Sequence, residues 1–148
     1  MSSNELLDEV RRWLRFARED LEAAETLTTE AGFRPRHVCW LAQQAAEKAL
    51  KGALTLQQIA FPFRHDLDAL RNLLPEGWQV KVRHPDLAEL TEWAVEARYP
   101  GDWPEATADD ARHAAEQARG VYESVRSDLV RYGVQLEESL EHDGDDTA

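Results

Sequence analysis

The chain of 148 residues is 43% hydrophobic and 31% charged, which fits one globular domain with well-solvated helices. Its formal net charge of -12 excludes a protein that coats nucleic acid with a wide basic surface, because phosphate binding depends on accumulated positive charge. No apolar run is long enough for a membrane span. The first residues, MSSNELLDEVRRW, lack the apolar core of a secretory signal, so we expect a cytoplasmic protein. The single cysteine, Cys39, is expected to be a buried thiol.

The spacing of apolar residues predicts a first helix over residues 4–30. Ser2 followed by Glu5 has the form of a capping box, and Gly32 is well placed to end the helix. The apolar residues recur at steps of three and four, namely Leu6, Val10, Trp13, Leu14, Ala17, Leu21, Ala24 and Leu27. The opposite face is charged and carries Arg11, Arg12, Arg15, Arg18 and Glu22.

A second helix is predicted over residues 35–58, where strong helix formers predominate. Pro35 suits the first helical turn. An apolar stripe of small residues, on which a neighbouring helix can pack closely, consists of Val38, Ala42, Ala45, Ala46, Ala49 and Ala53. His37 and several polar residues lie on another face of this helix.

Three further helices are predicted over residues 66–74, 85–99 and 107–138. Asp66 can cap the first of them, and Thr107 with Asp110 can cap the last. No strand-like alternation is present, so the sequence predicts an all-α, antiparallel up-and-down bundle of four long helices and one short one. The bundle should occupy residues 1–136. Residues 137–148 carry six acidic side chains and no Lys or Arg, and are most simply a disordered, solubilising tail.

Four stretches, in this order and spacing, resemble the prokaryotic HEPN domain, the nucleotide-binding domain of higher eukaryotes and prokaryotes. They are W-L-x-x-A-x-x-D-L-x-x-A at residues 13–24, QQAAEKALKGAL at 43–54, FPFRHDL at 61–67 and ARYP at 97–100. The resemblance extends over about residues 10–130. It implies a helical bundle that pairs as a homodimer, often beside a minimal nucleotidyltransferase in a toxin–antitoxin-like system.

Many HEPN proteins are metal-independent ribonucleases that carry an Arg and, after four to six intervening residues, a His. In this chain no Arg stands at that distance before His37, His65, His84, His113 or His142. The resemblance therefore points to the non-nucleolytic branch of the family, for which binding of a nucleotide or of a partner is the usual proposal.

The second helix carries the first candidate ligand-binding residues. Steps of four and three place Gln44, Lys48 and Lys51 on adjoining parts of one face, where an amide and two ammonium groups could meet a phosphate. The alternative is a solvated face on which Glu47 pairs with Lys51. His65 could hydrogen-bond a ligand or act as a general acid or base, or it could tie its loop to a helix end.

Arg98 and Tyr99 complete the candidate set. The guanidinium of Arg98 can bind a phosphate or a carboxylate, or can interact with the carbonyl groups at the end of its own helix. Tyr99 is expected to pack with its hydroxyl group at a rim. No E-x-x-H pair, P-loop or G-x-G-x-x-G is present, so the sequence indicates no metal and no cofactor.

Three functions follow from these observations. The first is a non-catalytic HEPN protein that binds a nucleotide or another phosphate-bearing ligand. The second is a module for protein–protein interaction only. The third is a metal-independent ribonuclease with a displaced motif that uses Arg98 and His65 from separate parts of the fold.

Overall fold

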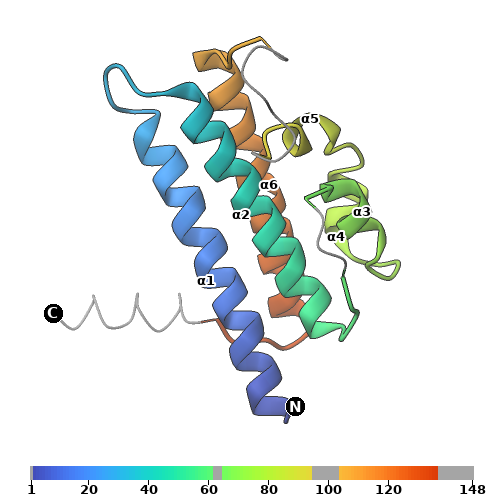
Figure 1. The fold of residues 1–148 in the computed structure, drawn as a ribbon. Helices are drawn as coiled ribbons and strands as arrows, with labels where there is room; N and C mark the ends of the chain where they lie inside the picture. The colour runs from blue at the N-terminus through green and yellow to red at the C-terminus, as the bar shows by residue number, and fades with distance from the viewer. Residues whose placement is uncertain (1, 62–64, 95–103, 137–148) are drawn as a thin grey trace, which may run out of the picture.

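The computed structural model describes residues 2–61, 65–94 and 104–136, and all regular structure within these ranges is helical. Figure 1 shows three long helices side by side, α1 (Ser3–Leu27), α2 (Pro35–Leu56) and α6 (Ala108–Arg131). Three short helices, α3 (Leu67–Asn72), α4 (Gln79–Arg83) and α5 (Ala88–Thr91), lie together beside α2 and α6. The predicted all-α bundle is confirmed.

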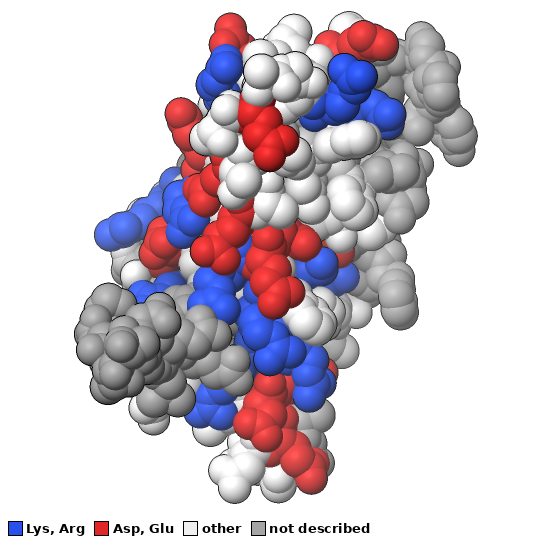
Figure 2. All heavy atoms as spheres, turned by 90° about the vertical axis from the view of Figure 1, so that its left-hand side faces the viewer, with Lys and Arg blue, Asp and Glu red and all other residues white. Residues whose placement is uncertain are grey.

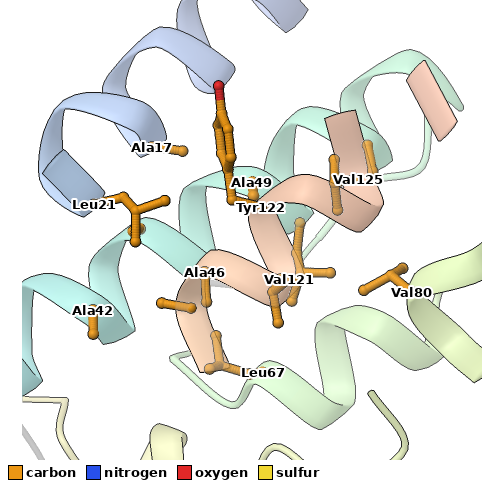
Figure 3. Packing of buried hydrophobic residues seen from close by; sticks show 14 of the residues in the cluster. Ala17, Leu21, Ala42, Ala46, Ala49, Leu67, Val80, Val121, Tyr122 and Val125 are labelled. Carbon is orange, nitrogen blue, oxygen red and sulfur yellow. The ribbon is translucent and has the colours of Figure 1, made fainter. Parts of the chain in front are cut away.

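The core forms where the apolar stripes of the long helices meet around α2 (Figure 3). Each alanine of the predicted stripe on α2 is fully buried, which lets α1 and α6 approach it from two sides. Gly52 lies where α1 packs tightly against α2, because a Cβ atom at this position would lie only 2.5 Å from Cδ2 of Leu14 on α1. Cys39 is buried, as predicted.

The predicted caps are also confirmed. Ser2 and Glu5 form a capping box at the start of α1, and Thr107 and Asp110 form another at the start of α6. The side chain of Asp66 accepts a hydrogen bond from the backbone N–H of Ala69 at 3.1 Å and caps α3. These local patterns set where three of the helices begin.

The chain between α3 and α6 differs from the prediction of one long helix over residues 85–99. The structure has the separate helix α4 at Gln79–Arg83, and α5 ends at Thr91. After Thr91, the backbone N–H groups of Trp93 and Ala94 donate hydrogen bonds to the carbonyl groups of Leu90 and Thr91. These carbonyl groups lie three residues earlier in the chain, not four as in an α-helix. Residues 95–99 lie outside the described residues. Three helices of the described chain are therefore long, not the four that were predicted.

The end of α6 is a second difference. The helix stops at Arg131 rather than near residue 138, because Gly133 adopts a φ of 91°, a left-handed conformation that ends helices. Val134 and Leu136 then pack against the bundle and are buried. The acidic tail, residues 137–148, lies outside the described residues. Within the described chain, no helix has the length and hydropathy that crossing a membrane requires.

Candidate functional site

A buried carboxylate joins α2 to the loop that precedes α3. Glu47 is only 4% exposed. Its Oε1 atom lies 2.6 Å from Nδ1 of His65 and 3.1 Å from Nε2 of Gln43, and its Oε2 atom accepts a hydrogen bond from Nζ of Lys51 at 2.9 Å. We call these four residues the Glu47 cluster. Every polar contact that a buried carboxylate requires is thus supplied within the fold.

Two features of local sequence assemble the cluster. Gln43, Glu47 and Lys51 follow one another at intervals of four along α2, which aligns their side chains along one edge of the helix. The loop is fixed by the Asp66 cap and by Leu67, which is fully buried. Gln43 adds a hydrogen bond to the backbone carbonyl of His65 at 3.1 Å.

The electrostatic balance of the cluster favours an ionised Glu47. Burial raises the pKa of Glu47, but hydrogen bonds from Lys51, His65 and Gln43 and the charge of Lys51 outweigh burial, so this pKa lies below its ordinary value. An ionised carboxylate can only accept hydrogen bonds, so Nδ1 of His65 carries a hydrogen and donates a hydrogen bond to Oε1 of Glu47. The arrangement fixes both the tautomer and the orientation of the imidazole.

The ammonium group of Lys51 contacts two aromatic rings in addition to Glu47. Its ammonium group lies 5.8 Å from the ring centroid of Trp13 and 5.6 Å from that of Phe61, within the range of cation–π attraction. Its side chain is 12% exposed. The sequence offered a pairing of Lys51 with Glu47 on a solvated face as the alternative to a phosphate site. The pairing is present, but the carboxylate is buried.

The other predicted residues of α2 point toward different partners. Nζ of Lys48 lies 2.5 Å from Oδ2 of Asp20 on α1. Gln44 donates to Oε1 of Gln43 at 2.8 Å, at the margin of the Glu47 cluster. The structure thus brings Lys51 and His65 together around Glu47 and directs Lys48 toward α1. Arg98 and Tyr99 lie outside the described residues.

Sequence reasoning proposed Lys51 and His65 as ligand contacts and considered Glu47 only as a partner of Lys51, whereas the structure shows Glu47 joining the two. The regular spacing of Gln43, Glu47 and Lys51 on an alanine-rich helix was the available signal, since three polar residues there share one edge. Nothing local indicated that Asp20 would neutralise Lys48. Among the described residues, no group of three or more His, Cys, Asp and Glu side chains is placed to hold a metal ion.

Comparisons with a family model and with solved structures agree on the family of this chain. The model of the HEPN domain matches residues 10–128. The crystal structure of TT1696 from Thermus thermophilus is 30% identical in sequence with a TM-score of 0.67, and the match covers 80% of this chain and 97% of that one. The crystal structure of ST0689, an archaeal HEPN homologue, is 27% identical in sequence with a TM-score of 0.65. This match covers 82% of this chain and 98% of that one. No curated protein matches. The chain belongs to the HEPN domain family.

Proposed function

We propose that this HEPN protein is a binding module without nuclease activity, whose ligand is a nucleotide or another phosphate-bearing molecule held beside the Glu47 cluster. The observation that supports this proposal is the 2.6 Å contact between Glu47 and His65. It joins the QQAAEKALKG stretch to the HDL stretch, two of the segments that carry the family resemblance. The protein acts as a homodimer paired with a minimal nucleotidyltransferase, as the family resemblance implies.

The contacts of the two lysines indicate which of them is available to a ligand. Lys48 and Asp20 are 26% and 22% exposed, so this pair is more accessible to solvent than the pair of Lys51 and Glu47. A phosphate can therefore replace Asp20 as the partner of Lys48 at a smaller cost than it could replace Glu47 as the partner of Lys51. Lys51 would have to leave a carboxylate that is 5% exposed, which would strand a buried charge. We assign ligand contact to Lys48 and His65, and support of His65 to Glu47 and Lys51.

His65 suits this role because its side chain is 36% exposed while Glu47 anchors it from within. In the protonated state the imidazolium donates hydrogen bonds from both ring nitrogens. Gln44 lies beside Gln43 and can add an amide contact. Arg98 and Tyr99 stay in the proposal as further ligand contacts on the basis of the sequence alone.

Thermal unfolding of the protein in the presence of ATP, GTP, AMP, cyclic nucleotides or inorganic phosphate tests which of these compounds binds. A ligand at a hundred times its dissociation constant adds about 2.7 kcal/mol to the free energy of unfolding, which raises the midpoint measurably. We expect Lys48→Gln and His65→Ala to abolish a selective rise. Lys81→Gln is the matched control, because Lys81 contacts Leu74 and Glu76. A flat panel, or a rise that Lys48→Gln and His65→Ala leave intact, contradicts the proposed site.

Protein–protein interaction alone is the second candidate. It is favoured by the pairing of both Lys48 and Lys51 with carboxylates, which leaves little positive charge on the face where a phosphate was predicted. Co-purification with a nucleotidyltransferase encoded beside this protein would support it, together with a flat nucleotide panel. Cleavage of a mixed RNA pool that is lost in His65→Ala would instead establish the third candidate, a ribonuclease.

A further inference from the structure

We propose that the acidic tail, residues 137–148, binds a row of arginine side chains on its own bundle. These arginines lie along the junction of α1 and α6, and we call them the arginine band. They are Arg11, Arg15, Arg18 and Arg126. The contact is separate from the ligand site. It is supported by the placement of the arginines, by the position of the last described residue and by the charge of the tail.

Three arginines of the band share one flank of α1. Arg11, Arg15 and Arg18 follow one another at steps of four and three, which spreads them over about 10 Å of the helix axis on one side. Asp8 pairs with Arg11 at one end of this row. Glu22 pairs with Arg18 at the other end. The row therefore suits a short anionic segment, since a long one would meet carboxylates at both ends.

The helix α6 adds the fourth arginine. Nε of Arg119 on α6 donates a hydrogen bond to Oε2 of Glu25 on α1 at 2.9 Å, and the two helices run in opposite directions (Figure 1). Arg126 follows Arg119 by seven residues, or about two helical turns. Arg18 precedes Glu25 by the same interval, so Arg126 comes level with Arg18. Figure 2, which faces the side on which α1 lies, shows Lys and Arg gathered near the middle, with Asp and Glu above and below them.

The last described residue lies beside the arginine band. Nε of Arg11 donates a hydrogen bond to the backbone carbonyl of Gln135 at 2.6 Å, and Leu136 is buried. Two glutamates follow directly in the sequence. An extended stretch over residues 137–141 can reach up to about 17 Å, which is more than the length of the band. The first half of the tail can therefore cover the band from its Arg11 end.

The charge of the tail is complementary to the band. The tail has six acidic side chains and no Lys or Arg. Asp8 and Glu22 are 68% and 62% exposed, and ion pairs of exposed side chains are weak, so tail carboxylates can join or replace them. Because the tail is attached at one end of the band, its effective concentration there is in the millimolar range. Another acidic segment would have to compete with this attached one.

Paramagnetic relaxation enhancement measures the contact in the full chain. Cys39 is the only cysteine and is fully buried, so a nitroxide can be attached selectively at Gly144→Cys. In about 10 mM salt, where the Debye length is about 30 Å, we expect the amide signals of residues 11–18 and of Arg126 to lose intensity. In about 1 M salt, where this length is about 3 Å, the signals of Arg18 and Arg126 should recover. Signals of α3, α4 and α5 should keep their intensity throughout.

Arginine variants of equal charge locate the contact on the bundle. The double variant Arg15→Gln, Arg18→Gln removes half of the band and should restore the signal of Arg126. The double variant Arg34→Gln, Arg36→Gln removes the same charge from exposed residues at the start of α2. It should leave the loss of intensity unchanged. Circular dichroism shows whether each variant is folded.

Two triple variants of equal charge locate the contact within the tail. The first is Glu137→Gln, Glu138→Gln, Glu141→Gln. The second is Asp143→Asn, Asp145→Asn, Asp146→Asn. The first removes the carboxylates that can reach along the band and should restore the signals of Arg18 and Arg126. The second should restore them less, because its residues lie further from the point where the tail leaves the bundle.

Several outcomes would overturn the proposed contact. A tail that only hangs from Leu136 would affect its immediate surroundings equally in low and high salt. It would also respond alike to both arginine variants. Loss of intensity in an isotope-labelled chain that is mixed with a spin-labelled one would show that the tail binds a second copy instead of its own bundle. Full intensity at residues 11–18 in low salt would show that the tail does not bind α1.

Discussion

Nδ1 of His65 lies 2.6 Å from Oε1 of Glu47, so a loop residue is tied to a buried carboxylate 18 positions earlier in the chain. The same carboxylate accepts a hydrogen bond from Lys51. Glu47 thus has two functions in the fold, since it compensates a cation that is largely withdrawn from water and it orients the imidazole proposed to meet the ligand. Substitutions at Glu47 should therefore affect both stability and binding.

The first prediction concerns the charge of Glu47. Glu47→Gln leaves the Lys51 ammonium group largely buried without a carboxylate, and breaking such a pair from one side costs about 3 kcal/mol. Urea unfolding measures the loss. The double variant Glu47→Met, Lys51→Met removes both charges and should lose less than Glu47→Gln alone. Equal stability of Glu47→Gln and the parent protein would show that the pair contributes nothing.

The second prediction concerns acid pH. Because the pKa of Glu47 is lowered in the folded state, the carboxylate contributes stability that is fully present above its unfolded pKa of about 4.5 and is lost as the pH falls through the folded value. Stability measured from pH 6 down to about pH 3 should therefore fall less steeply in Glu47→Gln than in the parent protein. If the stability of the two proteins fell in parallel over this pH range, the result would contradict a lowered pKa of Glu47.

The third prediction concerns His84, which packs against α6 at Gly120. Burial lowers the pKa of His84, a hydrogen bond with the Gly120 backbone opposes this, and the charges of Arg83 and Arg71 lower it further. The unfolded chain therefore binds a proton more readily than the folded one, and stability decreases as the pH falls below about 6.5. His84→Gln should remove this part of the pH dependence. A difference in stability between the two proteins that stays constant from pH 8 to about pH 5 would argue against it.

Local sequence was sufficient for the long helices and for the start of α3, but not for α4 and α5. The Ser2 and Thr107 caps and the apolar stripes involve neighbours within one or two helical turns, so they can be read along the chain. The start of α4 depends instead on Asp128 of α6, which accepts a hydrogen bond from the backbone N–H of Gln79 at 2.8 Å. No pattern near Gln79 encodes a cap supplied 49 residues later.

The same distinction applies to the candidate site. The pairing of Glu47 with Lys51 follows from helical spacing and was considered from the sequence. The pairing of Lys48 with Asp20 depends on how α1 packs against α2, and the burial of Glu47 depends on the loop that carries His65. Sequence reasoning therefore anticipated the pairing of Glu47 with Lys51 along one helix. It could not decide which of the candidate residues would be neutralised by another element.

The fourth prediction tests the close approach of α1 and α2 at Gly52. Alanine is the better helix former by about 1 kcal/mol, so Gly52→Ala would stabilise an isolated helix. In this fold the new methyl group would lie 2.5 Å from Cδ2 of Leu14 and 3.1 Å from Cβ of Trp13. Overpacking of this kind costs about 1–3 kcal/mol.

We therefore expect Gly52→Ala to lower the free energy of unfolding in urea, against its helix propensity. Leu14→Ala removes the nearer of the two obstructing side chains, so Gly52→Ala should cost less in a Leu14→Ala background than in the parent protein. The double-mutant cycle isolates this coupling, because residues in contact are not additive in stability. A gain in stability from Gly52→Ala alone would mean that the helices separate easily at this point and that Gly52 does not set their distance.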